Sequence, residues 1–232
     1  MSIKEVLISI RKANDKVYSD DSYDIMAKAM TLMQLEKLRI LFIRNFMREF
    51  HNCKRILDIG AGNGSMTLEL IRRYRAQYVL LDISITGLKK ALKKLPSTLS
   101  DFVVASAEYL PFRRSSINAV YTTFALRQIV LEKLIPNVKY VLKSNGVFGV
   151  LDFWLPSNLL GKIILHVFTT FIVPLEALVI TPRNIKEYAI VRKSIKYIPE
   201  AQDLVKIFKK FFTKVNVVFK VLGIFIILIS TL

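Results

Sequence analysis

Short apolar runs alternate with amphipathic stretches through the middle of the chain. Runs with the length and composition of strands cover residues 56–59, 77–82, 101–105, 117–124 and 147–153. Between them, apolar residues recur at helical spacing over 65–74, 84–95 and 128–142. Pro136 is expected to kink or divide the last of these helices. The alternation predicts five parallel strands joined by helical crossovers, an α/β arrangement.

A helical segment precedes the first strand. Over residues 20–50 apolar side chains follow a helical period, and Phe42, Phe46 and Phe50 are four residues apart. Steps of four place the three rings on one helix face, which we expect to pack against the sheet. Residues 1–12 predict a further short amphipathic helix.

Residues 159–180 are apolar enough to suggest a membrane helix. Four residues interrupt the span: Lys162, His166, Pro174 and Glu176. A charge at the bilayer centre costs about 2.5–3.5 kcal/mol, and proline breaks the helical hydrogen-bond ladder. We therefore expect two short helices that cover the ligand edge of the sheet, within a helical substrate cover over 154–200. Ordinary core helices are the alternative.

The C-terminal part predicts two helices, at about 183–196 and 200–212, and then two strands. Residues 215–219 and 223–229 are apolar runs separated by a tight turn, which is typical of an antiparallel hairpin. The second run is apolar throughout, so it fits a position inside the sheet that is buried on both faces.

Composition indicates a single folded domain over residues 1–232. Hydrophobic residues make up 53% of the chain and charged residues 23%, which argues against disorder. Cys53 is the single cysteine and the chain has two histidines, so we expect neither a disulfide framework nor a catalytic metal site. A cytoplasmic location is the default expectation.

The formal net charge of +17 requires a further explanation. Residues 181–220 contribute ten Lys or Arg against three Asp or Glu, a local net of +7. An anionic membrane surface and nucleic acid are both partners that such charge attracts. A solvated helix face is the third interpretation. No aromatic-studded basic run supports nucleic acid, which leaves peripheral contact with the inner face of a membrane beside the solvated helix face as the open interpretations.

The stretch from Ile56 to Thr67 carries the clearest chemical signal. A strand leads into a turn with Gly60, Gly62 and Gly64, and a helix follows at once. Glycine permits positive φ and a close approach of the backbone to a ligand. Strand, glycine turn and helix together predict a nucleotide-cofactor site.

Two carboxylates narrow the choice of cofactor. Asp82 ends the second strand about 20 residues after the glycines, where a carboxylate binds ribose hydroxyls. Asp58 stands before the glycines, and ILDIGAGNGSMT closely resembles the first motif of class I S-adenosylmethionine (SAM) methyltransferases. That resemblance implies SAM as cofactor and a Rossmann-like, seven-stranded sheet. The expected strand order is 3-2-1-4-5-7-6, with strand 7 antiparallel and helices on both faces.

Further motifs resemble the UbiE family, SAM-dependent C-methyltransferases of menaquinone and ubiquinone synthesis. They are Tyr23-Asp24-x-Met26, the segments 105–112, 123–128 and 141–146, and Tyr188 followed by 193–199. Residues 1–50 would then form a helical N-terminal lid. Five positions depart from the family pattern: Ser106 replaces an acid that binds the adenine amino group, Gln128 an asparagine, and Lys193 an acid. Leu35 and Leu38 stand where the family has an N-terminal histidine and tryptophan.

The resemblance implies a set of site residues. Arg127 would stabilise the ionising hydroxyl of a prenylated quinol, although an arginine that binds carbonyls at a helix end is the simpler alternative. The expected SAM-binding residues are Tyr23, Asp58, Gly60, Gly62, Thr67, Asp82, Ser106, Ala107 and Thr123. Methylation of another lipid or small molecule is the second hypothesis. A nucleic-acid methyltransferase or a non-catalytic binder is the third, and the oligomeric state is open.

Overall fold

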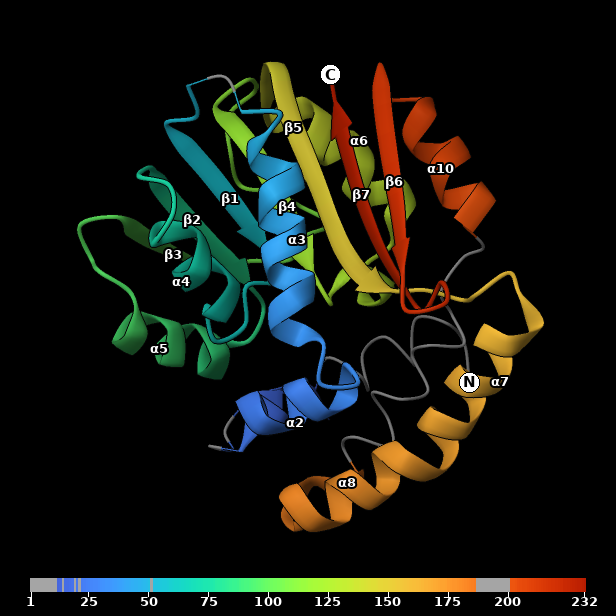
Figure 1. The fold of residues 1–232 in the computed structure, drawn as a ribbon. Helices are drawn as coiled ribbons and strands as arrows, with labels where there is room; N and C mark the ends of the chain where they lie inside the picture. Colours follow the sequence, from blue (N-terminus) through green and yellow to red (C-terminus); the bar gives the residue numbers. More distant parts are fainter. Residues whose placement is uncertain (1–11, 14, 19, 21, 51, 187–200) are drawn as a thin grey trace.

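A mixed seven-stranded sheet forms the centre of the molecule, in the order β3-β2-β1-β4-β5-β7-β6 (Figure 1). The computed structural model describes residues 12, 13, 15–18, 20, 22–50, 52–186 and 201–232. The strands are β1 Arg55–Ile59, β2 Gln77–Asp82, β3 Ser100–Val104, β4 Ile117–Thr123, β5 Leu142–Phe153, β6 Lys214–Lys220 and β7 Phe225–Thr231. Only β7 runs antiparallel to its neighbours, β5 and β6. The predicted topology is confirmed.

The helices cover the sheet and its lower edge. They are α2 Tyr23–Met30, α3 Leu35–Met47, α4 Ser65–Ile71, α5 Ile85–Lys94, α6 Leu131–Val141, α7 Leu159–Val167, α8 Val173–Ile180 and α10 Ala201–Lys209. Short turns of other helix types are η1 Leu126–Gln128, η2 Phe168–Ile172 and η3 Pro182–Asn184. In Figure 1, α3 crosses the near face of the sheet and α6 lies behind it.

Phe42 and Phe46 of α3 pack against the sheet, as their spacing predicted, whereas Phe50 lies beyond the end of the helix. The rings of Phe42 and Phe46 are fully buried, with centroids 6.2 and 5.7 Å from that of Tyr121 on β4. The helix comes so close to β5 that a Cβ on Gly149 would lie 2.7 Å from Phe46 and 2.9 Å from Phe42. A glycine at that strand position is therefore needed to admit α3.

The C-terminal hairpin also lies where its sequence placed it. β7 fills the slot between β5 and β6, and its residues from Phe225 to Ser230 are buried. Because β7 is buried along its length, it has no polar side to alternate with its apolar one.

One predicted helix end and the predicted division of a helix at Pro136 differ from the structure. Helix α4 ends at Ile71 rather than near 74. Pro136 lies inside α6 without dividing it, because the helix is fixed by fully buried residues on both sides of the proline, Leu134, Ile135 and Val138. The predictions for residues 1–11 and for most of 183–196 lie outside the described residues.

The largest difference is at residues 159–180. Instead of two short helices, α7, η2 and α8 form one continuous helix, Leu159–Ile180. Pro174 does not interrupt it, because it follows a π-helical segment and stands at the first turn of α8, where a missing amide is tolerated. This is one described helix whose length and composition would allow it to cross a membrane.

Candidate functional site

The glycine turn bends the chain sharply between β1 and α4. Gly60, Gly62 and Gly64 have φ values of +71°, +52° and +71°, a conformation that side chains disfavour. Space is also lacking, since a Cβ on Gly60 would lie 2.5 Å from that of Ala125. The turn therefore exposes backbone where any other residue would place a side chain.

Asp82, at the carboxyl end of β2, is tied to this turn. Its Oδ2 accepts the amide of Gly62 and its Oδ1 the amide of Ser84, both at 2.8 Å. Each oxygen keeps a further lone pair, because an ionised carboxylate has about four acceptor sites. Burial raises the pKa of Asp82, while the amide hydrogen bonds oppose this shift. Asp82 thus supports the turn and can still accept hydrogen bonds from a ligand.

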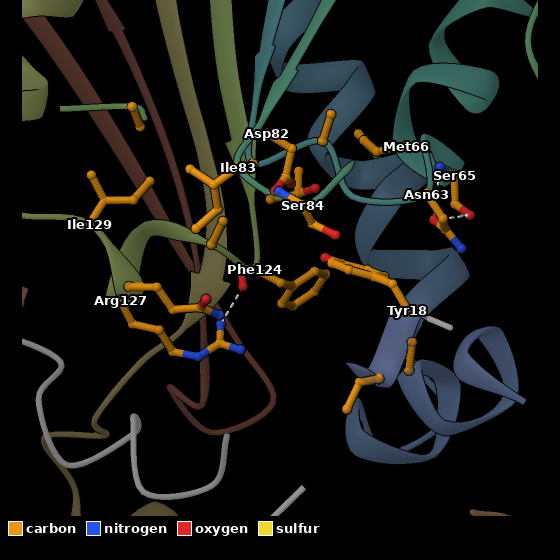
Figure 2. A pocket seen from close by; sticks show the side chains of 18 of the residues that line it. Tyr18, Asn63, Ser65, Met66, Asp82, Ile83, Ser84, Phe124, Arg127 and Ile129 are labelled. Atoms are coloured by element: carbon orange, nitrogen blue, oxygen red, sulfur yellow. Dashed lines mark hydrogen bonds between the residues drawn. The ribbon is translucent and has the colours of Figure 1, made fainter. Parts of the chain in front are cut away.

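A cavity of about 1290 Å³, counted with its open mouth, lies between the carboxyl ends of the strands and helix α2 (Figure 2). Seven of the predicted site residues line it: Tyr23, Gly60, Asp82, Ser106, Ala107, Thr123 and Arg127. Its wall is mostly apolar, with a few polar groups that converge from separate loops. Such a wall suits a large, partly apolar ligand.

Three predicted cofactor residues, Asp58, Gly62 and Thr67, do not line the cavity. Asp58 and Thr67 lie behind the turn, where the Thr67 hydroxyl donates to Asp58 Oδ2 at 2.6 Å and the Tyr121 hydroxyl donates to it at 2.9 Å. Both are almost fully enclosed, so they hold β1, β4 and α4 together. Gly62 is covered by Tyr18, whose hydroxyl a Cβ at Gly62 would overlap.

Arg127 projects from η1 into the cavity's other end. Its Nη1 donates to Asp152 Oδ1 and to the Phe124 carbonyl, both at 2.6 Å, and its guanidinium lies 5.4 Å from the centre of the Phe153 ring. The arginine side chain is 7% exposed and that of Asp152 is 2% exposed. Burial raises the pKa of Asp152, and the adjacent Arg127 counteracts it.

Comparison with known families identifies the chain. The model of the ubiE/COQ5 methyltransferase family matches residues 3–231, nearly the whole sequence. The chain belongs to the ubiE/COQ5 methyltransferase family.

Bacterial family members show moderate similarity. A UbiE protein named as a ubiquinone/menaquinone biosynthesis C-methyltransferase, from Blochmanniella floridana, is 28% identical over 67% of this chain and 64% of its own length. The protein of the same name from Pseudomonas aeruginosa is 33% identical, over 65% and 61%. A demethylmenaquinone methyltransferase from Chlamydia caviae is 27% identical, over 73% and 74%. The chain thus spans less than two thirds of the first two relatives.

Solved structures share the fold. The Haemonchus contortus phosphoethanolamine N-methyltransferase 2, in complex with S-adenosylhomocysteine, has a TM-score of 0.65 at 18% identity over 90% of this chain and 46% of its own. The plantazolicin methyltransferase BpumL, also solved with S-adenosylhomocysteine, has a TM-score of 0.63 at 12% identity over 99% and 97%. At such identities the likeness concerns the fold alone.

In this member of the ubiE/COQ5 family, two residues near the cavity escaped sequence reasoning. Tyr18 lies across the glycine turn, with its ring 4.7 Å from that of Tyr23, and burial raises its pKa well above the usual value. In the sequence it stands among polar residues, so no pattern pointed to it, although its ring projects into the pocket in Figure 2. Asp24 accepts hydrogen bonds from Asn63 at 2.9 Å, Ser65 at 3.2 Å and Lys94 at 3.0 Å. Asp24 belongs to the motif Tyr23-Asp24-x-Met26, so the signal that could have identified it was a carboxylate next to Tyr23.

Proposed function

We propose that the chain transfers a methyl group from SAM to a ring carbon of a reduced prenylated quinone of the menaquinone or ubiquinone type. Family membership and the names of its relatives support this activity. The observation that carries the proposal is that Asp82 and Arg127 face one largely apolar cavity from separate strand ends. A ribose-binding carboxylate and a phenolate-stabilising cation are the two groups that the reaction needs most.

The residues present fit SAM. The turn at Gly60 leaves room for a ligand against the backbone, and the spare lone pairs of Asp82 suit ribose hydroxyls. Ser106 and Ala107 would border the adenine, where the Ser106 hydroxyl accepts the amide of Glu108 at 3.2 Å and retains its own proton to donate. Thr123 and Tyr23 would contact the methionine part. When bound, SAM supplies an electrophilic methyl group.

Arg127 would prepare the acceptor. A hydroquinone carbon becomes a better nucleophile as a neighbouring hydroxyl ionises, and a fixed guanidinium favours the phenolate. The ion pair with Asp152 holds the guanidinium in place, so little reorganisation is needed when charge develops. Apolar groups around it, including Phe124 and Ile129, would exclude water from the ring.

The domain organisation belongs to the same proposal. We assign residues 1–50 as a lid over the cofactor and residues 154–200 as a cover that includes the substrate side. Residues of α2 support the lid assignment because Tyr23, Ala27 and Met30 line the cavity. Peripheral contact with the inner face of an anionic membrane follows from the net charge of +17 and from a lipid-tailed acceptor.

Product identification tests the function. The purified chain is incubated with SAM labelled in its methyl group and either a reduced demethylmenaquinone or a lipid extract, and labelled products are identified by mass. Methylation of the quinol on carbon is expected. Label in another lipid alone would support the second hypothesis instead, and no transfer to any acceptor, with SAM binding retained, would remove the catalytic proposal.

A further inference from the structure

The helix Leu159–Ile180 presents an unusual amount of apolar surface. In its most apolar stretch of 18 residues only 22% are buried. Nine large apolar side chains are at least 40% exposed: Leu159, Leu160, Ile163, Val167, Phe171, Ile172, Leu175, Leu178 and Val179. Single exposed apolar residues are ordinary, but a continuous set along one helix marks a contact surface.

The π-helical segment η2 aligns this surface. Leu159, Ile163, Val167, Phe171, Leu175 and Val179 recur every four residues. In a straight α-helix of 3.6 residues per turn, each such step drifts by about 40°, which over five steps would carry the stripe about 200° around the axis. The wider turn at Phe168–Ile172 under-winds the helix and reduces this drift. Exposed residues before and after η2 are therefore turned less far apart around the axis than in a straight α-helix.

The opposite side of the helix is attached to the lid. Phe168, Val173 and Ala177 pack in one buried cluster with Val17 and Met26, the latter on α2. Helix α2 in turn forms part of the cavity wall. In Figure 1 the helix curves along the lower edge of the molecule until α8 lies beside α2. Any object that binds the exposed stripe is thus one helix away from the cofactor cavity.

Charge favours a lipid surface over a second copy of the chain. Lys162, Arg183 and Lys186 are exposed on the helix or just after it, and the whole chain carries +17. Two copies docked through this face would bring like charges together, whereas an anionic bilayer offers both an apolar interior and opposite charge at its surface.

We propose that Leu159–Ile180 docks flat on an anionic bilayer, with its exposed stripe inserted below the headgroups and its buried side holding α2. The inference rests on the proposed membrane contact but not on the identity of the methyl acceptor. Docking in this orientation holds the cavity's lid one helix away from the bilayer that carries a prenylated substrate.

Flotation with vesicles tests the surface. The full chain is mixed with anionic vesicles of about 70% phosphatidylcholine and about 30% phosphatidylglycerol. The Phe171→Asp/Leu175→Asp variant should partition roughly tenfold more weakly than the parent. The matched variant Leu92→Asp/Tyr140→Asp changes two apolar residues that are 55% and 53% exposed on α5 and α6, and it should change partitioning less than twofold, about the noise of such an assay. Equal losses in both variants would overturn the proposal.

Depth measurements test the orientation. Leu159→Cys, Phe171→Cys and Val179→Cys are each labelled with an environment-sensitive fluorophore, while the native Cys53 is buried. Nitroxide lipids that quench at the headgroup or in the acyl chain should report one similar shallow depth for all three. A span of 22 residues would instead separate its ends by about 33 Å across the bilayer. Depths that differ by this much would overturn flat docking. A fluorophore shift that appears without vesicles and accompanies self-association would also overturn it. SAM binding is measured in every variant. If it is unchanged, a failure of flat docking is distinct from a failure of the proposed activity.

Discussion

Arg127 and Asp152 form a buried ion pair that joins the ends of two adjacent strands, with Nη1 and Oδ1 2.6 Å apart. Asp152 is the second-last residue of β5 and also accepts the amides of Leu126 and Phe153, both at 2.8 Å. Arg127 follows β4 in η1. Both oxygens of the Asp152 carboxylate thus accept hydrogen bonds. The planar guanidinium of Arg127 therefore has a fixed direction in the cavity.

The fixed fork of Arg127 predicts a loss of turnover in Arg127→Lys. Lysine keeps the charge but cannot reproduce the planar geometry that links Asp152, the Phe124 carbonyl and an ionising quinol. We expect turnover to fall by about tenfold to a hundredfold, a rise of roughly 1.4–2.7 kcal/mol in the barrier, with SAM affinity unchanged. The measurement is the rate of quinol methylation together with calorimetry of SAM binding.

Folding must be checked in the same variant, because disrupting a buried ion pair costs about 3–5 kcal/mol when one charge is left alone. Trp154 is the chain's single tryptophan and is 1% exposed, so its fluorescence reports the core next to Asp152. A variant with native fluorescence that turns over as fast as the parent would clear Arg127 of a catalytic role.

Asp82→Ala should bind SAM at least about tenfold more weakly, since a hydrogen bond to a charged group contributes about 1.5–3 kcal/mol. The carboxylate acts in two ways, as a ribose acceptor and as the partner of the Gly62 and Ser84 amides. Calorimetry with SAM and with its demethylated product measures the effect. Asp101→Ala, an exposed acid on the neighbouring strand β3, is the matched control. Equal affinities in the two variants would remove Asp82 from the site.

Features that depend only on residues close in the sequence could be predicted from it. The strand–glycine–helix unit, the carboxylate of Asp82 beside the glycine turn and the buried last strand each follow from local chemistry. Ser84 caps α5 by accepting the Gly87 amide at 2.9 Å. The sheet order itself came from the family resemblance.

Other features depend on contacts distant in sequence. Asp58 has the spacing of a cofactor residue, but its side chain turns toward Tyr121, which lies 63 positions later in the sequence. Pro174 has the local signature of a helix break, yet a π-helical segment accommodates it. Neither outcome is visible in a local pattern, because each depends on how the backbone packs against another element.

Asp24→Asn should speed the release of SAM. Asp24 joins the lid helix α2 to the glycine turn through Asn63, Ser65 and Lys94. Burial opposes its ionisation, but the hydrogen bonds from Asn63 and Lys94 outweigh burial and lower its pKa. A half-exposed pair is worth about 0.2–1 kcal/mol, so the dissociation rate should rise by up to about fivefold. Stopped-flow displacement measures this rate.

The control for Asp24 is Glu36→Gln, which breaks the exposed ion pair with Lys28 on the outer side of the lid. That substitution also removes one negative charge from the N-terminal helices, but it touches neither the glycine turn nor the cavity. Equal dissociation rates in the two variants would show that net charge, rather than the attachment of the lid, governs release.

Asp58→Asn should flatten the dependence of stability on pH. Burial raises the pKa of Asp58 from 3.8 to about 7, even though the hydroxyls of Thr67 and Tyr121 favour its ionised form. From pH 3.8 to about 7 the folded chain holds a proton that the unfolded chain has released, so this carboxyl makes stability fall as pH rises. Its contribution to the slope is at most about 1.4 kcal/mol per pH unit. Asparagine stays neutral and its amide oxygen can still accept both hydroxyls, so urea unfolding at several pH values should show a shallower fall than in the parent. Asp101→Asn, at an exposed position, should leave the slope unchanged. If the slopes of the parent and of Asp58→Asn coincide, Asp58 is ionised in the folded chain across this range, and the buried cluster behind the glycine turn carries a negative charge at neutral pH.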